Sequence, residues 1–175
     1  MSPSDDPRCR AKPTINEVRD EAGTRGIEVI FHVGVAPDPL LAILWDVANF
    51  GRLFPDIKET TVRRSSGGDP PTVIELAYRV DAVMKEVRYT LRRELDPGAR
   101  EITWREVSGD LKRVRGGWLV RPTDAPGVSL TTYRAFVDIG TYVPTWIVAK
   151  SAKRKAAEMV DRVRRVAVEL AEAAR

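Results

Sequence analysis

The fold is decided by residues 36–55, which read Ala-Pro-Asp-Pro-Leu-Leu-Ala-Ile-Leu-Trp-Asp-Val-Ala-Asn-Phe-Gly-Arg-Leu-Phe-Pro. Asp38 can cap a helix here, and Pro39 suits the first helical position because an N–H at that position has no intrahelical partner. The residues that follow are almost all apolar, so we expect a short helix that is largely buried. This helix ends in a short aromatic turn closed by Pro55.

Strand-like segments lie on both sides of this helix. Residues 27–35 carry apolar side chains at alternate positions, which is typical of a half-buried strand, and residues 14–19 could pair with them as a hairpin. After Pro55, turns rich in Gly, Pro and Asp separate strand-like segments at a spacing typical of an antiparallel meander. These segments are 58–64, 72–80, 82–95, 101–107, 111–121 and 128–138.

A long helix is predicted to end the chain. Pro144 opens it, and neither Gly nor Pro occurs from Thr145 to Arg175, which at 1.5 Å per residue gives a length of ~45 Å. One face is basic: Lys150, Lys153, Arg154, Lys155, Arg162, Arg164 and Arg165. The apolar stripe has mostly small residues in its first half, which would allow close packing on a sheet or leave space beneath the helix: Ala149, Ala152, Ala156, Met159, Val160, Val163, Ala167, Leu170 and Ala174.

The bulk composition indicates one globular domain. A chain of 175 residues with 43% hydrophobic and 31% charged residues can bury a substantial core. Residues 1–13 contain three prolines and several charges, so we expect a flexible N-terminus followed by a single domain over 14–175. We see no signal-peptide pattern and no apolar run of the ~18 residues that a membrane span needs. With a single cysteine, Cys9, these features favour a cytoplasmic protein.

Several kinds of chemistry find no support in the sequence. His32 is the only histidine and Cys9 is distant from it, so we expect no metal site. There is no nucleophile elbow, phosphate loop or dinucleotide fingerprint, so we also expect no cofactor. The net charge of +4 permits attraction to nucleic acid or anionic lipid but does not argue for either.

Three segments, taken in order, resemble the START-like, helix-grip superfamily, and within it the polyketide cyclase/dehydrase and coenzyme Q-binding group. Residues 36–59 are similar to the first helix of the family, in which a Trp-Asp pair precedes an aromatic residue and a proline. Residues 107–122 are similar to its Gly-Xaa-aromatic turn and the strand with Gly-Xaa-Trp, and the third similar segment is residues 130–138, followed by Val-Pro and a basic helix. The resemblance covers about residues 26–172.

The resemblance implies an α+β fold with a curved antiparallel sheet of six to seven strands, two short helices after the first strand, and the long C-terminal helix over a cavity. Phe50, Leu53, Phe54 and Pro55 would then form a turn at the cavity mouth. Alternation along the strands favours inward positions for residues 74, 76, 78 and 80, for 87, 89 and 91, and for 133, 135 and 137. The same reasoning places 102 and 104, and 114, 118 and 120, on the inner face.

The cavity would be lined mainly by aromatic residues of the sheet and small residues of the last helix. The candidate ligand-binding residues are Trp45, Phe50, Phe54, Tyr78, Tyr89, Trp104, Trp118, Tyr133, Ala152, Ala156 and Met159. Phe136 and Trp146 are further aromatic residues of these elements. Cyclases of this superfamily are thought to polarise a polyketone with a residue in the cavity, and Arg134 is our candidate for that role.

Three functional hypotheses follow from the resemblance. We favour binding or carriage of a hydrophobic or amphipathic small molecule, such as a lipid, polyketide or quinone, without catalysis. The alternative is an enzyme, a polyketide aromatase/cyclase or dehydratase. The third is a ribosome- or RNA-associated module that uses the basic C-terminal helix, which could instead touch a membrane surface.

Overall fold

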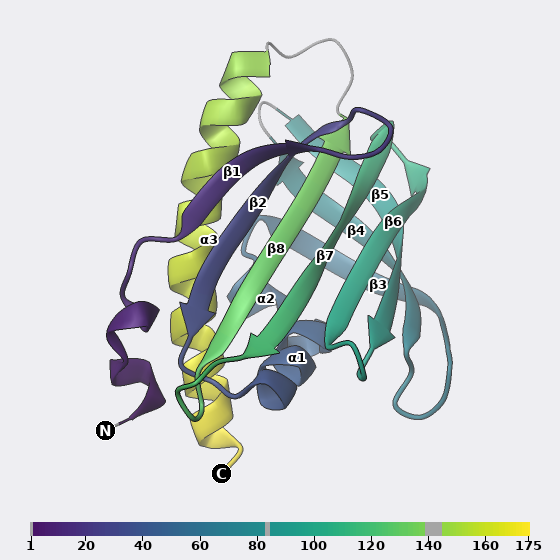
Figure 1. The fold of residues 1–175 in the computed structure, drawn as a ribbon. Helices are drawn as coiled ribbons and strands as arrows, with labels where there is room; N and C mark the ends of the chain where they lie inside the picture. Colours follow the sequence, from purple (N-terminus) through teal and green to yellow (C-terminus); the bar gives the residue numbers. More distant parts are fainter. Residues whose placement is uncertain (1, 83–84, 139–144) are drawn as a thin grey trace.

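The computed structural model describes residues 2–82, 85–138 and 145–175. Figure 1 shows one curved antiparallel sheet with a long helix, α3, lying along one of its faces. The elements in chain order are η1 (Pro3–Asp5), η2 (Pro7–Cys9), β1 (Thr14–Arg19), β2 (Arg25–Val33), α1 (Pro37–Trp45), η3 (Val47–Asn49), α2 (Phe50–Leu53), β3 (Ile57–Ser66), β4 (Val73–Ala82), β5 (Lys85–Asp96), β6 (Glu101–Gly109), β7 (Arg113–Pro122), β8 (Ser129–Asp138) and α3 (Thr145–Ala173).

The sheet has eight strands in the order β1-β2-β8-β7-β6-β5-β4-β3. The predicted meander from β3 to β8 is confirmed, and the last strand pairs with β2, with Val29 opposite Tyr133. The predicted count of six to seven strands is too low, because residues 14–19 form a full edge strand, β1, that pairs with β2. The short helices consequently follow the second strand rather than the first.

The short helix α1 begins at Pro37, two residues before the predicted start. Asp38 does not cap it, because the N-cap residue is Ala36 and its side chain makes no capping bond. The Asp38 carboxylate instead accepts a hydrogen bond of 2.6 Å from Nε of Arg100. As the apolar sequence predicts, α1 is largely buried, and its buried side chains are Leu40, Leu41, Leu44 and Trp45.

The N-terminal segment, predicted to be flexible over residues 1–13, contains two short 3-10 turns in its described part. The Asp6 carboxylate accepts hydrogen bonds from Arg8, and Arg8 also contacts Asp124 in the β7–β8 loop at 2.6 Å. These turns lie beside β2, and Cys9 is buried there.

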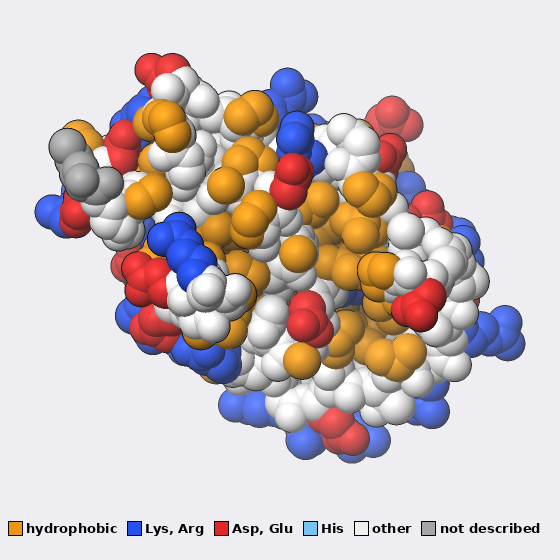
Figure 2. Space-filling view, turned by 90° about the horizontal axis from the view of Figure 1, so that it is seen from below, with side chains coloured by type: hydrophobic (Ala, Val, Ile, Leu, Met, Phe, Trp, Pro, Cys, Tyr) orange, Lys and Arg blue, Asp and Glu red, His pale blue; other side chains and the backbone are white. Residues whose placement is uncertain are grey.

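The hydrophobic core lies between the concave face of the sheet and the three α-helices (Figure 1). Figure 2 shows the molecule from below, which is the end at which α1 and the C-terminus lie in Figure 1. Hydrophobic side chains gather in the middle of this surface, and charged side chains lie mostly around its margin. No helix in the described part of the chain is long and apolar enough to cross a membrane.

Candidate functional site

An inner chamber of about 240 Å³ lies between the concave face of the sheet and the turn that follows α1. Strands β4 to β8 and residues 50–57 contribute side chains to it. Most of these side chains are aromatic or apolar: Phe50, Phe54, Ile57, Tyr78, Tyr89, Leu91, Arg93, Trp104, Val114, Trp118, Tyr133, Ala135 and Val137. The chamber is therefore an aromatic pocket that contains one cationic side chain.

Strand alternation explains which side chains reach this chamber. Along β4, Ile74, Leu76 and Tyr78 are buried, as predicted for the inner face. Along β5, Val87 and Leu91 are buried on the same face. Continuing the period of two along β5 brings position 93 to the inner face as well.

Arg93 is the residue that sequence reasoning missed, although its position in the β5 alternation could have identified it. Its side chain is buried, with only 3% of the residue exposed. The guanidinium donates hydrogen bonds to the backbone oxygens of Trp45 at 3.3 Å and Leu44 at 3.1 Å, at the C-terminal end of α1. A helix C-terminus carries partial negative charge, which stabilises a cation at that position.

Two aromatic rings lie against the Arg93 guanidinium. Its central carbon lies 4.9 Å from the Trp45 ring centre and 4.7 Å from the Phe50 ring centre. Burial lowers the pKa of Arg93, yet a guanidinium remains protonated in proteins. Within the described part of the chain no carboxylate pairs with it, so the chamber holds a positive charge without an acidic counter-ion.

Three tyrosines place phenol groups at the inner chamber. Tyr78 and Tyr89 stack with ring centres 5.3 Å apart, and Tyr133 packs against Trp118 at 4.6 Å. Burial raises the pKa of Tyr78 and of Tyr133 to about 12, and also raises that of Tyr89, so all three are neutral at physiological pH. Their hydroxyl groups make no hydrogen bond to another residue that the structure describes. These hydroxyls can therefore donate to, or accept from, a ligand.

An outer chamber of about 260 Å³ lies beneath the middle of α3. Its walls combine α3 with the turn after α2 and with β2 and β8: Ile27, Leu53, Phe54, Pro55, Asp56, Tyr133, Ala152, Lys155, Ala156, Glu158, Met159 and Arg162. At its edge, Nζ of Lys155 contacts Asp56 at 2.7 Å and so joins α3 to the turn before β3. Phe54 and Tyr133 line both chambers and lie between them.

The structure brings most of the predicted ligand-binding residues to one chamber or the other. Trp45 is an exception, because it lies behind Arg93 and its indole Nε1 donates to the Pro71 oxygen at 3.1 Å. Phe136 is on the outer face of β8, and Trp146 lies outside the residues whose side chains are described.

Arg134, our sequence-based catalytic candidate, does not reach either chamber. It follows Tyr133 in β8 and therefore points to the outer face of the sheet, where it contacts Glu28 at 2.6 Å. Its side chain is 59% exposed, and its hydrogen bonds lower the pKa of the Glu28 carboxyl. The arginine that lines the inner chamber is Arg93, not Arg134.

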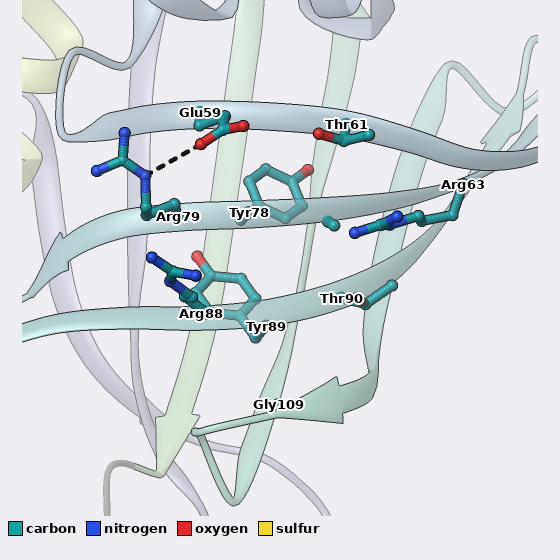
Figure 3. A pocket seen from close by; sticks show the side chains of 10 residues that line it. Glu59, Thr61, Arg63, Tyr78, Arg79, Arg88, Tyr89, Thr90 and Gly109 are labelled. Atoms are coloured by element: carbon teal, nitrogen blue, oxygen red, sulfur yellow. Dashed lines mark hydrogen bonds and ion pairs between the residues drawn. The ribbon is translucent and has the colours of Figure 1, made fainter.

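The outer face of β3 to β5 has its own hollow of about 260 Å³, drawn in Figure 3. Arg79 contacts Glu59 in this hollow at 3.1 Å, and Arg79 and Arg88 contact the nearby Glu86 at 3.0 and 3.5 Å. This arrangement is typical of a solvated sheet face with cross-strand ion pairs.

The basic face of α3 is partly engaged in ion pairs. Lys153 contacts Glu17 of β1 at 3.4 Å, and Arg165 contacts Glu169 at 3.3 Å. Arg164 donates to the backbone oxygen of His32 at 2.9 Å. In the part of the chain that the structure covers, His, Cys, Asp and Glu side chains form no group of three that could hold a metal ion.

Comparison with known families places this cavity in context. Residues 33–164 match the family model described as polyketide cyclase/dehydrase and lipid transport. The chain belongs to this family. The match spans the two short helices, the meander and most of α3, so it includes nearly all residues of both chambers. No curated protein matches the chain in sequence.

Solved structures share the fold of this family member at low sequence identity. Human STARD10 has a TM-score of 0.73 at 17% identity, covering 93% of this chain and 72% of its own. A START superfamily protein from Mycobacterium smegmatis has a TM-score of 0.71 at 16% identity, covering 83% and 98%. The Zhui aromatase/cyclase from Streptomyces sp. R1128 has a TM-score of 0.58 at 20% identity, covering 91% of each chain. These likenesses establish the helix-grip fold.

Proposed function

We propose that this protein binds and carries an amphipathic small molecule in the cavity between its sheet and α3. The observation that carries the proposal is the buried guanidinium of Arg93 in a chamber of aromatic rings, with tyrosine hydroxyls that have no hydrogen-bond partner among the described residues. Ligand sites are usually concave and apolar, with a few polar groups that fix the orientation of the ligand. The inner chamber has this composition.

The polar groups of the chamber indicate which end of the ligand they would bind. The described hydrogen bonds of Arg93 use two nitrogens, Nη1 and Nη2, and leave Nε without a described acceptor. The hydroxyls of Tyr78, Tyr89 and Tyr133 are available as donors. Donors of this kind favour an oxygen-bearing group, either a carbonyl or an anion such as a carboxylate or phenolate.

The family description and the relatives support the same proposal. The family description combines polyketide cyclases and dehydrases with lipid transport. A STAR-related lipid transfer protein from Xanthomonas axonopodis shares the fold, with a TM-score of 0.70 at 15% identity, covering 89% of this chain and 93% of its own. Lipids and polyketides both combine an apolar body with oxygen-bearing groups, which suits a cavity of this chemistry.

The experiment compares two adjacent arginines on opposite faces of β5. A fluorescent fatty acid and its neutral methyl ester are titrated into the wild type, Arg93→Met and Arg92→Met. Arg92 is the matched control, because it lies on the outer face and contacts Glu94 at 2.7 Å. Loss of a charge-assisted hydrogen bond should weaken binding of the acid about ten- to a hundredfold in Arg93→Met.

The ester should lose less affinity in Arg93→Met, and Arg92→Met should bind both probes as the wild type does. Circular dichroism verifies that each variant is folded, since Arg93 also satisfies the carbonyls of Leu44 and Trp45. If the wild type takes up neither probe, the proposed function is wrong. If Arg93→Met binds the acid as tightly as Arg92→Met does, Arg93 does not bind the carboxylate of the ligand.

A second candidate function, polyketide cyclisation or dehydration, is favoured by the same constellation. A guanidinium and phenol hydroxyls aimed at a carbonyl oxygen can stabilise an enolate that forms there. The test incubates the protein with a linear polyketone mimic and follows the absorbance of the aromatic product. Turnover by the wild type that Arg93→Met abolishes, with Arg92→Met unaffected, would establish an enzyme in place of a carrier.

A further inference from the structure

Phe54 and Tyr133 divide the cavity into two chambers, and the difference between the walls of these chambers indicates which class of ligand the cavity would bind. We propose that the two chambers bind chemically different halves of one molecule, and that Phe54 is the partition that must turn aside for a ligand to span them. The ligand would have a flat, oxygen-bearing ring system at one end and a flexible aliphatic portion at the other. This inference rests on the proposed function and specifies the class of ligand.

The chemistry of the walls differs between the chambers. The inner chamber presents rings from several strands, together with Arg93 and the phenol groups. Flat rings stack on aromatic side chains, and a guanidinium binds oxygen acceptors. The wall of the outer chamber along α3 combines the small or pliable side chains of Ala152, Ala156 and Met159 with three charged residues, Lys155, Glu158 and Arg162. The apolar strip of this wall suits an aliphatic chain, which has no oriented polar group to satisfy.

The volumes of the two chambers are evidence that a ligand uses them together. The inner chamber holds about 240 Å³ and the outer about 260 Å³. Each is below the lower limit of ~300 Å³ that is usual for small-molecule pockets, whereas the joined space falls within the usual range. A ligand of ordinary size therefore occupies both chambers, and the residues between them decide whether it can.

Of the two residues that separate the chambers, Phe54 is the one that can move. Tyr133 lies in the middle of β8, where the strand pairs with β2 and β7, and its backbone is fixed by both neighbours. Phe54 follows the last residue of the four-residue helix α2 and is only half-buried. Its ring meets Phe50 edge-on at 5.4 Å and lies 6.2 Å from Trp118, and because Phe54 is not part of a strand, rotation of its side chain breaks these ring contacts without moving the sheet.

The test uses naphthol with an alkyl chain of increasing length, from methyl to hexyl, and measures affinity by fluorescence titration. Each buried methylene is worth about a fourfold gain in affinity, so hexyl-naphthol should bind the wild type at least about thirtyfold more tightly than methyl-naphthol. In Ala152→Phe, which fills the outer chamber, this ratio should fall below about threefold, because the affinity for hexyl-naphthol is reduced more than that for methyl-naphthol. Ala156→Trp is a second variant with the same expectation, in case one of the two fails to fold.

Stopped-flow measurements of the association rate test separately whether Phe54 is the partition. Phe54→Ala should bind hexyl-naphthol at least about tenfold faster than the wild type, because no side chain has to be displaced, and the association rate of methyl-naphthol should rise by a smaller factor. Phe136→Ala, the same substitution on the outer face of β8, is the matched control and should alter neither rate.

The possible failures are distinguishable. Binding of no naphthol by the wild type overturns both the proposed function and this inference. Equal affinity for methyl- and hexyl-naphthol overturns the inference alone, as does a chain-length dependence that survives in the folded filling variants. An unchanged association rate in Phe54→Ala overturns the assignment of Phe54 as the partition.

Discussion

Two neighbouring hydroxyl groups in the core give a sharp prediction about stability. Ser129 and Thr131 lie on the same inward face of β8, and both are 0% exposed. The Ser129 hydroxyl donates to the backbone oxygen of Val35 at 2.6 Å. The Thr131 hydroxyl has no hydrogen-bond partner among the described residues. The two positions therefore differ in whether a buried polar group is satisfied.

Thr131→Val should stabilise the protein. A buried hydroxyl without a partner costs about 1–3 kcal/mol, and valine has the same shape with a methyl in place of the hydroxyl. Valine also favours strands, so no propensity opposes the change. We expect the free energy of unfolding to rise by about 1 kcal/mol or more, and Tm by about 2–4 °C for each kcal/mol in a chain of this length. Urea titration and a thermal melt measure the two quantities.

Ser129→Ala is the matched control, and its effect should have the opposite sign. It removes a hydrogen bond and leaves the Val35 carbonyl without its side-chain donor, so the free energy of unfolding should fall by about 1 kcal/mol. If Thr131→Val instead lowers the free energy of unfolding, the Thr131 hydroxyl has a partner and the reasoning is refuted.

Four further predictions concern titration and packing. Burial raises the pKa of Tyr78 and Tyr133 to about 12, so the unfolded state loses phenol protons first as pH rises above ~10, and stability should fall between about pH 10 and pH 12. Urea midpoints across this range, compared with those of Tyr78→Phe, measure the effect; a flat profile would contradict it. Burial lowers the pKa of His32 from its usual 6.5, so the unfolded state takes up a proton first below that pH and stability should fall with acidification. His32→Gln should remove this part of the pH dependence of the urea midpoint. Gly116→Ala should destabilise by more than about 2 kcal/mol, measured by urea titration, because a Cβ there would lie 2.2 Å from the Arg134 oxygen and 2.6 Å from the Trp104 ring. Lys155→Met should change the free energy of unfolding by less than about 1 kcal/mol, since its pair with Asp56 is exposed; a larger loss in a urea titration would show a stronger tie between α3 and the turn before β3.

The sequence by itself determined the elements and most of the cavity wall. The period of two in β4 and β5 identified Tyr78, Tyr89 and Leu91 as sharing the buried side, and the small residues at helical spacing identified Ala152 and Ala156. These are local patterns, because each depends only on side-chain spacing along one element. The same alternation, extended by one step, would have found Arg93, and it places Arg134 opposite to Tyr133.

The tertiary structure decided which elements meet. The pairing of β2 with β8 depends on contacts between residues about a hundred positions apart, such as Val29 and Tyr133, which no local pattern encodes. Likewise, Arg93 is held by carbonyls at the end of α1, some fifty residues away. The division of the cavity arises because the turn after α2 brings Phe54 against Tyr133 of β8, and only the packed fold sets how much space remains on either side.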